Sequence, residues 1–116
     1  MERILVIDDE WGMREGISRI LRASEYECDT AENGEKGMAL FHEQEYSVFL
    51  VDLKLPDIDG LSLLKTFRQE KPNTVCIVIS AYANLETAIS TTRAGAFDFL
   101  AKPFTPDQLR LVVRRG

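Results

Sequence analysis

The chain has 116 residues, of which 14 are Lys or Arg and 19 are Asp or Glu, so its formal net charge at pH 7 is −5. This length fits a single domain over residues 1–116, and the acidic balance argues against direct binding of nucleic acid by that domain. No apolar run approaches the roughly 20 residues that cross a bilayer, so we expect no membrane segment.

The two cysteines indicate the compartment in which the protein works. Cys28 and Cys76 both lie in apolar, strand-like segments, and the chain has no C-x-x-C pair. Disulfides are rare in the reducing cytoplasm, whereas buried free thiols are common there. We therefore expect two reduced core cysteines and a cytoplasmic location.

Short apolar runs rich in β-branched residues alternate along the chain with longer segments of helical periodicity. The five runs that we interpret as strands cover residues 4–7, 26–31, 48–51, 75–79 and 97–100. The first and third runs are apolar throughout, which is typical of central strands in a parallel sheet. The second run is more polar, so we expect it nearer an edge of the sheet.

Five helices are predicted after these strands, from apolar residues that recur at intervals of three and four. In chain order, the residues on their apolar faces are Met13, Ile17, Ile20, Leu21, Met38, Leu40, Phe41, Gly60, Leu63, Leu64, Phe67, Leu85, Ala88, Ile89, Leu109, Val112 and Val113. Asn33 and Asn84 are typical N-caps of the second and fourth helices, and Gly95 is a typical end of the fourth. Thr105 and Gln108 predict a capping box at the start of the fifth helix.

This alternation defines the predicted fold class. Five strands that alternate with five helices predict an α/β fold, a doubly wound sandwich built around a parallel sheet. In such sheets, ligands bind beyond the carboxyl ends of the strands. The residues that follow each strand are therefore the first candidates for a functional site.

Polar side chains follow four of the five predicted strands. Asp8 and Asp9 come after the first strand, Asp52 ends the third, Ser80 follows the fourth and Lys102 follows the fifth. Because parallel strands end at the same edge of a sheet, these residues should lie close together. The sequence therefore predicts a patch that contains three carboxylates, a hydroxyl and an ammonium group.

Such a patch suits phosphoryl chemistry. Neighbouring carboxylates either take up protons or hold a cation, and oxygen ligands without His or Cys favour Mg²⁺. A magnesium ion beside a lysine is an arrangement for phosphoryl groups, on which a carboxylate can act as a nucleophile. Spacing alone favours Asp52 as the nucleophile and Asp8 and Asp9 as metal ligands, and it leaves that assignment open.

Several short motifs also carry a family resemblance. They are Asp8-Asp9-Glu10, Val51-Asp52 with Pro56 and Asp59-Gly60, Ser80-Ala81, and Lys102-Pro103-Phe104. In order and spacing, over essentially the whole chain, they resemble the receiver domain of bacterial two-component response regulators. Residues 81–104 are further similar to the nitrogen-regulator (NtrC-like) branch of that family. The resemblance implies a flavodoxin-like, five-stranded parallel sheet of order 2-1-3-4-5.

The resemblance also implies a metal-dependent phosphorylation. Asp52 would accept a phosphoryl group from a phosphohistidine of a sensor histidine kinase. Asp9, Asp52 and the backbone carbonyl of Lys54 would coordinate Mg²⁺, with Asp8 acting through water. We further hypothesise that Lys54 and Tyr82, which flank the site, set the lifetime of the phosphorylated form.

The remaining residues that the resemblance assigns belong to catalysis and switching. Lys102 would contact the phosphoryl oxygens, and Ser80 would hydrogen-bond the phosphoryl group. Phe99, where many members carry Tyr, would then turn inward. The Lys102–Pro103 peptide bond would be cis.

Phosphorylation would thereby change an output face formed by the fourth helix, the fifth strand and the fifth helix. That face is also a candidate homodimer interface. The chain stops within its last predicted helix, so we expect a domain of a longer regulator. Its output module, of a transcriptional regulator by resemblance, would lie outside residues 1–116. The sequence defines neither the cognate kinase nor the regulated genes.

Three other functions compete with this interpretation. A degenerate receiver used only for protein contacts would normally lack an acidic residue or the lysine, and none is missing here. A Mg²⁺-dependent phosphatase that forms an aspartyl-phosphate usually needs a second carboxylate at the position of Lys54. A flavodoxin-like cofactor site would need a phosphate loop where Asp8 and Asp9 stand. We therefore expect a signalling domain that catalyses its own phosphorylation and dephosphorylation, without a turnover substrate.

Overall fold

The computed structural model describes residues 2–81 and 84–115, with the side chain of Leu85 also outside the described part. Ten elements alternate along these described residues. They are β1 (Arg3–Ile7), α1 (Trp11–Ala23), β2 (Glu27–Ala31), α2 (Gly34–Glu43), β3 (Val48–Asp52), α3 (Gly60–Glu70), β4 (Val75–Ser80), α4 (Leu85–Arg93), β5 (Asp98–Ala101) and α5 (Pro106–Arg115). All five predicted strands and all five predicted helices are thus confirmed.

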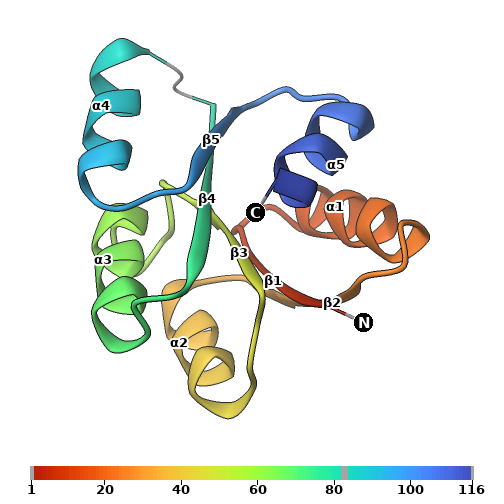
Figure 1. The fold of residues 1–116 in the computed structure, drawn as a ribbon, viewed down its shortest axis with the longest axis horizontal. Coiled ribbons are helices and arrows are strands. Elements are labelled where there is room, and N and C mark those ends of the chain that lie inside the picture. The colour runs from red at the N-terminus through yellow and green to blue at the C-terminus, as the bar shows by residue number, and fades with distance from the viewer. Residues whose placement is uncertain (1, 82–83, 116) are drawn as a thin grey trace.

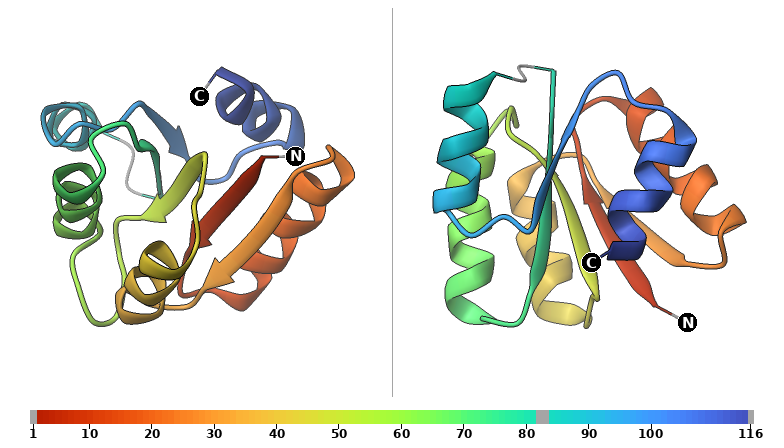
Figure 2. Two further views of the ribbon diagram at one scale, coloured as in Figure 1. Left: turned by 60° about the horizontal axis from the view of Figure 1, so that its bottom comes forward. Right: turned by 45° about the horizontal axis from the view of Figure 1, so that its top comes forward.

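The strands form one sheet in the order β2-β1-β3-β4-β5, and every neighbouring pair is parallel. Helices α1 and α5 cover one face of the sheet, and α2, α3 and α4 cover the other (Figures 1 and 2). Helices α1 to α4 fall on both faces because crossovers between parallel strands are right-handed and the chain reverses its direction across the sheet after β2. The predicted doubly wound fold and strand order are confirmed.

Alternation along the central strands builds two hydrophobic clusters, one on each face. On β1, Ile4 and Val6 point to the α1/α5 face, whereas Leu5 and Ile7 point to the other face. The second cluster is centred on three aromatic rings, those of Phe41, Phe49 and Phe67, whose centroids lie 4.4–5.5 Å apart. Full burial of such a side chain stabilises the fold by roughly 1.5–3 kcal/mol. The two clusters therefore hold the sheet rigidly beneath the edge that carries the polar residues.

The predicted helix ends are confirmed by specific hydrogen bonds. The side chains of Asn33 and Asn84 each accept a bond of 2.8 Å from the backbone N–H three residues further on. Thr105 and Gln108 exchange reciprocal bonds of 2.9 and 3.1 Å. Gly95 follows α4 with a φ of 100°, as expected for the end of a helix.

Two apolar residues lie differently from the sequence interpretation. Phe97 precedes β5 and is 49% exposed, and Ile89, counted on the apolar face of α4, is 43% exposed. Trp11, the first residue of α1, is 70% exposed. Helix α4 lies at the edge of the sheet beside the four-residue strand β5. That short strand offers α4 less surface to cover than a central strand would.

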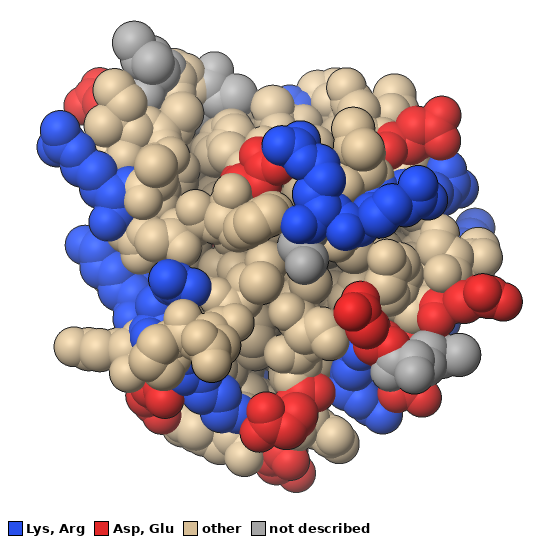
Figure 3. Space-filling view, viewed as in Figure 1, with Lys and Arg blue, Asp and Glu red and all other residues tan. Residues whose placement is uncertain are grey.

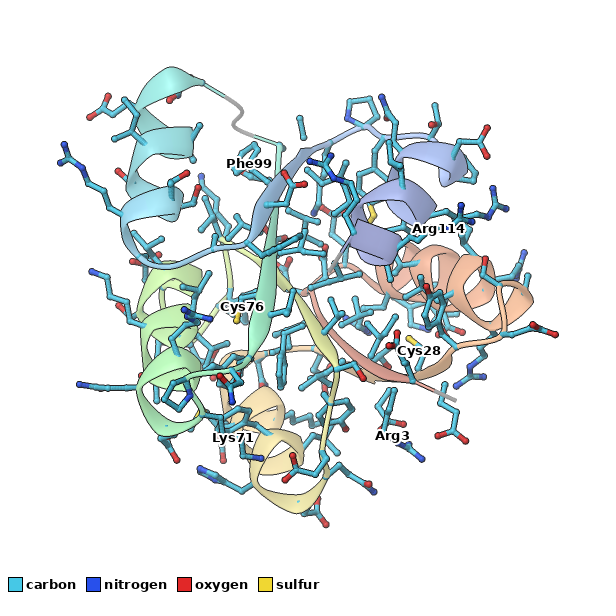
Figure 4. All side chains as sticks on the ribbon, viewed as in Figure 1. Arg3, Cys28, Lys71, Cys76, Phe99 and Arg114 are labelled. Atoms are coloured by element: carbon cyan, nitrogen blue, oxygen red, sulfur yellow. The ribbon has the colours of Figure 1, made fainter. Side chains whose placement is uncertain are left out.

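Both cysteines are free and buried, as predicted, and they lie on opposite faces of the sheet (Figure 4). Among the described residues, no helix combines the length and apolar character needed to cross a membrane.

Candidate functional site

The carboxyl ends of the strands meet at one edge of the sheet (Figure 2). Asp8 directly follows β1, and Asp52 and Ser80 are the last residues of β3 and β4. Lys102 directly follows β5, and its backbone N–H donates to the carbonyl of Ser80 at 2.8 Å. The register between β4 and β5 therefore places Lys102 beside Ser80, at the edge of the sheet where the sequence predicted it.

The side chain of Lys102 joins two carboxylates. Its Nζ donates to Oδ2 of Asp8 at 2.9 Å and to Oδ2 of Asp52 at 3.0 Å. All three side chains are buried, with 9% or less of each exposed. Such a buried ammonium group offsets the repulsion between two carboxylates that would otherwise face each other in a medium of low polarity.

Asp8 is held in place by hydrogen bonds of its backbone and of its side chain. Its N–H donates to the carbonyl of Ala31 at 3.1 Å, and its Oδ1 accepts a bond from the N–H of Glu10 at 2.9 Å. The Arg14 guanidinium donates to the carbonyl of Asp8 at 2.8 Å. The turn after β1 is therefore fixed before any ligand arrives.

Asp52 is fixed by the loop between β3 and α3. Its Oδ1 accepts a bond from the N–H of Lys54 at 3.1 Å. The loop closes where the N–H of Gly60 donates to the carbonyl of Leu53 at 3.0 Å. A Cβ on Gly60 would lie 2.2 Å from the carbonyl oxygen of Asp52, so only glycine allows this approach. Oδ2 of Asp52 remains directed to Lys102.

The environment shifts the pKa of both partners in this pair. Burial raises the pKa of Asp52, and the hydrogen bonds from Lys54 and Lys102 offset this only in part. For Lys102, burial alone would lower the pKa, but hydrogen bonds to Asp8 and Asp52 outweigh it and raise the pKa above its ordinary value. Lys102 is therefore charged at neutral pH. A further positive charge nearby would favour the ionised form of Asp52.

A cavity of about 210 Å³ opens above these residues. Its lining comprises Asp9, Glu10, Asp52, Lys54, Ala81 and Lys102. Carboxylate oxygens of Asp8, Asp9 and Glu10 lie within 4.8 Å of one another beside it. Hard oxygen donors without nitrogen or sulfur suit Mg²⁺, so the residues present fit that ion.

The structure brings together most of the residues predicted for the site. Asp9, Asp52, Lys54 and Lys102 share the cavity, and Asp8 lies beneath it. Ser80 is buried at the end of β4 and does not line the cavity. The Lys102–Pro103 bond is cis, as expected.

Phe99 and Glu10 lie near the polar edge in different ways. Phe99 is partly buried against the α2/α3/α4 cluster, and in Figure 4 it lies on the side of β5 that faces α4. Glu10 joins the acidic cluster, although its sequence motif had suggested no role for it; its position directly after Asp8 and Asp9 was the available signal. Tyr82 lies outside the described residues.

Comparison with known proteins gives the same family. Residues 4–114 match the response regulator receiver domain model. The chain is 38% identical over its full length to the regulatory protein AtoC of Escherichia coli, covering 25% of it. It is 36% identical to the DNA-binding transcriptional regulator NtrC of Salmonella typhimurium over 97% of the chain and 24% of that protein. The response regulator TrrA of Thermotoga maritima, solved with Mg²⁺-BeF, superposes with a TM-score of 0.90 at 35% identity, covering 99% of this chain and 98% of that one.

The chain belongs to the response regulator receiver domain family. It is a phosphorylation-switched signalling domain of that family, and its relatives include the nitrogen regulators that the motifs resembled. Members are signalling domains rather than turnover enzymes. The chain spans about a quarter of the length of these two curated relatives.

Proposed function

We propose that Asp52 accepts the phosphoryl group and that Lys102 and the surrounding acidic residues make this reaction possible. The observation that carries the proposal is the position of the Lys102 Nζ, 3.0 Å from Asp52 and 2.9 Å from Asp8, next to the acidic cavity. Of Asp8, Asp9 and Asp52, Asp52 alone both lines the cavity and accepts a hydrogen bond from this lysine. It is therefore the best-placed nucleophile.

Asp8, Asp9, Asp52 and the backbone carbonyl of Lys54 would hold a Mg²⁺ ion, and the Glu10 carboxylate lies close to them. When bound, the ion supplies positive charge that neutralises the phosphoryl oxygens and the crowded carboxylates. The complex of TrrA with Mg²⁺-BeF supports this assignment by similarity.

The protein's own groups then act on the phosphoryl donor. An oxygen of the ionised Asp52 carboxylate attacks phosphorus, the new O–P bond forms, and the bond to the donor's histidine nitrogen or acetate oxygen breaks. The leaving group keeps the electron pair of that bond. Lys102 exchanges its bond to Asp52 for a bond to a phosphoryl oxygen. Its positive charge then stabilises the negative charge of the transferred group.

Ser80 and Phe99 would convert this local event into a change of the output face. Ser80 ends β4, the strand that precedes α4, and Phe99 lies on the side of β5 that faces α4. A hydrogen bond from Ser80 to the phosphoryl group would draw the end of β4 toward the site. The partly buried Phe99 ring would then repack inward, which makes α4 and β5 a two-state element biased by phosphorylation.

The phosphoryl donor in this proposal is a sensor histidine kinase. An apolar groove of about 330 Å³ lies between α1 and the segment that follows Lys102, with Met13, Ile17, Ile20, Pro103 and Phe104 in its lining. Since its two sides directly continue the Asp8–Glu10 turn and Lys102, a helix seated there would present its histidine near Asp52. In a transfer assay with a kinase that phosphorylates the wild type, Gly16→Glu should slow transfer but leave labelling by acetyl phosphate unchanged.

The output face carries exposed apolar residues on α4, just before β5 and on α5. Ile89 of α4, Phe97 before β5 and Leu111 of α5 are 43%, 49% and 54% exposed, and β5 lies between the two helices (Figure 1). Basic side chains gather over α5 in Figure 3. We assign a phosphorylation-dependent homodimer to this face. The dimer would be part of a cytoplasmic regulator whose transcriptional output module lies outside this chain.

Chemical trapping tests the assignment of the acceptor. The protein is phosphorylated with acetyl phosphate and Mg²⁺, reduced with borohydride, and digested for peptide sequencing by mass spectrometry. Reduction converts an aspartyl-phosphate to homoserine, which should occur at position 52. Homoserine at position 8 or 9 instead would overturn the assignment while leaving the family membership intact.

A further inference from the structure

The loop between β3 and α3 is bound at its tip to the start of another helix. Both carboxylate oxygens of Asp57 accept hydrogen bonds from α2: Oδ1 from the N–H of Gly34 at 2.8 Å, and Oδ2 from the N–H of Glu35 at 2.9 Å. These residues are 23 and 22 positions apart in the chain. Helix α2 already has a cap of its own, because Asn33 accepts from the N–H of Lys36. Asp57 is thus a second cap supplied by a different loop.

Apolar packing reinforces the same contact. The side chain of Ile58 lies directly over Gly34, and a Cβ on Gly34 would be 2.1 Å from the Cγ2 of Ile58. Glycine is therefore required at this point for the loop to reach the helix. The charge is also favourable, since the N-terminus of a helix attracts a carboxylate, and the bonds from Gly34 and Glu35 lower the pKa of Asp57.

The other end of this loop is the phosphoacceptor site itself. Asp52 begins the loop and accepts from the N–H of Lys54, and Lys54 pairs with Asp59 in an isolated antiparallel bridge. The loop is consequently held at its base by Asp52 and at its tip by α2. Lys54 lies between these two attachments.

We propose that Asp57 is a positioning residue of the phosphoacceptor site, which it serves by anchoring to α2 the loop that carries the Lys54 carbonyl. The inference rests on the proposed function, in which that carbonyl binds Mg²⁺. Residues that orient metal ligands without touching the metal typically change metal affinity about 10- to 100-fold when removed. Loss of the anchor should therefore weaken Mg²⁺ binding, whereas loss of the Asn33 cap should not.

Calorimetric titration with Mg²⁺ tests this on the wild type, Asp57→Ala, Asp57→Asn and the matched control Asn33→Ala. Both Ala variants lose capping bonds at the same helix end, but only one releases the loop. Asp57→Ala should bind Mg²⁺ about 10-fold more weakly, Asp57→Asn should fall between it and the wild type, and Asn33→Ala should bind within about twofold of the wild type. Gly34→Ala, which displaces Ile58, should weaken binding as Asp57→Ala does.

A second readout separates positioning from general destabilisation. The rate of phosphorylation by acetyl phosphate, followed against Mg²⁺ concentration, should reach half-maximum at a higher concentration in Asp57→Ala and approach the wild-type rate at saturation. Urea unfolding of each variant gives its stability independently. If Asp57→Ala does not fold, the comparison of Asp57→Asn with Asn33→Ala decides the question.

The Mg²⁺ titrations distinguish a failure of the inference about Asp57 from a failure of the proposed function. Equal Mg²⁺ affinities of the Asp57 and Asn33 variants would show that Asp57 only caps a helix, and the inference would fail. Wild-type protein that does not bind Mg²⁺, or binding that Asp9→Asn leaves unchanged, would refute the proposed function instead.

Discussion

The Nζ of Lys102 lies 3.0 Å from the Oδ2 of Asp52, a residue 50 positions earlier in the chain. Asp52 ends β3 and Lys102 follows β5, and β4 separates these two strands in the sheet. The contact depends on the register of both strand pairs, in which Asp52 lies opposite Ile79 and Ser80 lies opposite Ala101. The site is thus a product of the sheet rather than of a local motif.

Lys102→Met should destabilise the protein strongly in the absence of divalent cations. The substitution leaves Asp8 and Asp52 buried without their cation, and breaking a buried pair in this way costs about 3–5 kcal/mol. Urea unfolding at neutral pH measures the loss, and added Mg²⁺ should restore part of it because a metal ion replaces the missing charge. A surface lysine serves as the control: Lys36→Met removes an exposed pair with Glu32 and should change stability by no more than about 1 kcal/mol. Equal effects of the two substitutions would contradict the role given to Lys102.

The polar site could be predicted from the sequence because it depends on topology alone. Asp8, Asp52, Ser80 and Lys102 each follow a recognisable strand, and parallel strands end at one edge. Lys102 in particular reads as an ordinary surface lysine until the fold is known. Its place in the polar patch followed from the order of the strands, whereas its hydrogen bonds to Asp8 and Asp52 became known only from the structure.

Other features could not be predicted, because they depend on packing between loops and at edges. The bond from Gly34 to Asp57 joins the start of α2 to a loop whose path no periodicity determines. The exposure of Ile89 and Phe97 depends on how little of α4 a short edge strand covers. Helical spacing identifies an apolar face but not whether the neighbouring element is wide enough to bury it.

Gly60→Ala should disturb the acceptor loop, whereas Gly16→Ala should stabilise the protein. A Cβ on Gly60 would meet the backbone of Asp52 and Leu53 at 2.2 and 2.7 Å, while a Cβ on Gly16 would meet nothing within 4 Å. Overpacking of this kind costs about 1–3 kcal/mol, and Gly to Ala inside a helix gains about 0.5–1 kcal/mol. Thermal unfolding of both variants measures the difference. Similar melting temperatures for the two would refute the close approach of α3 to the end of β3.

Acid should remove the stabilisation that Asp57 provides. Hydrogen bonds from Gly34 and Glu35 lower its pKa below the ordinary value of 3.8. As the pH falls past that value, the unfolded chain binds a proton before the folded one does, so the free energy of unfolding decreases. The urea midpoints of the wild type and Asp57→Asn should differ by a constant amount from about pH 7 to about pH 5 and converge below about pH 4. A difference that stays constant into acid would mean that ionised Asp57 does not contribute.

The most direct test of the central claim is the intact mass of the protein after incubation with acetyl phosphate and Mg²⁺, with Asp52→Ala treated in parallel. The account predicts a gain of one phosphoryl group in the wild type, no gain in the variant, and no gain in either protein when the metal is chelated. A gain that survives Asp52→Ala, or a folded wild type that gains nothing, would contradict the assignment of Asp52 as the acceptor of this receiver domain.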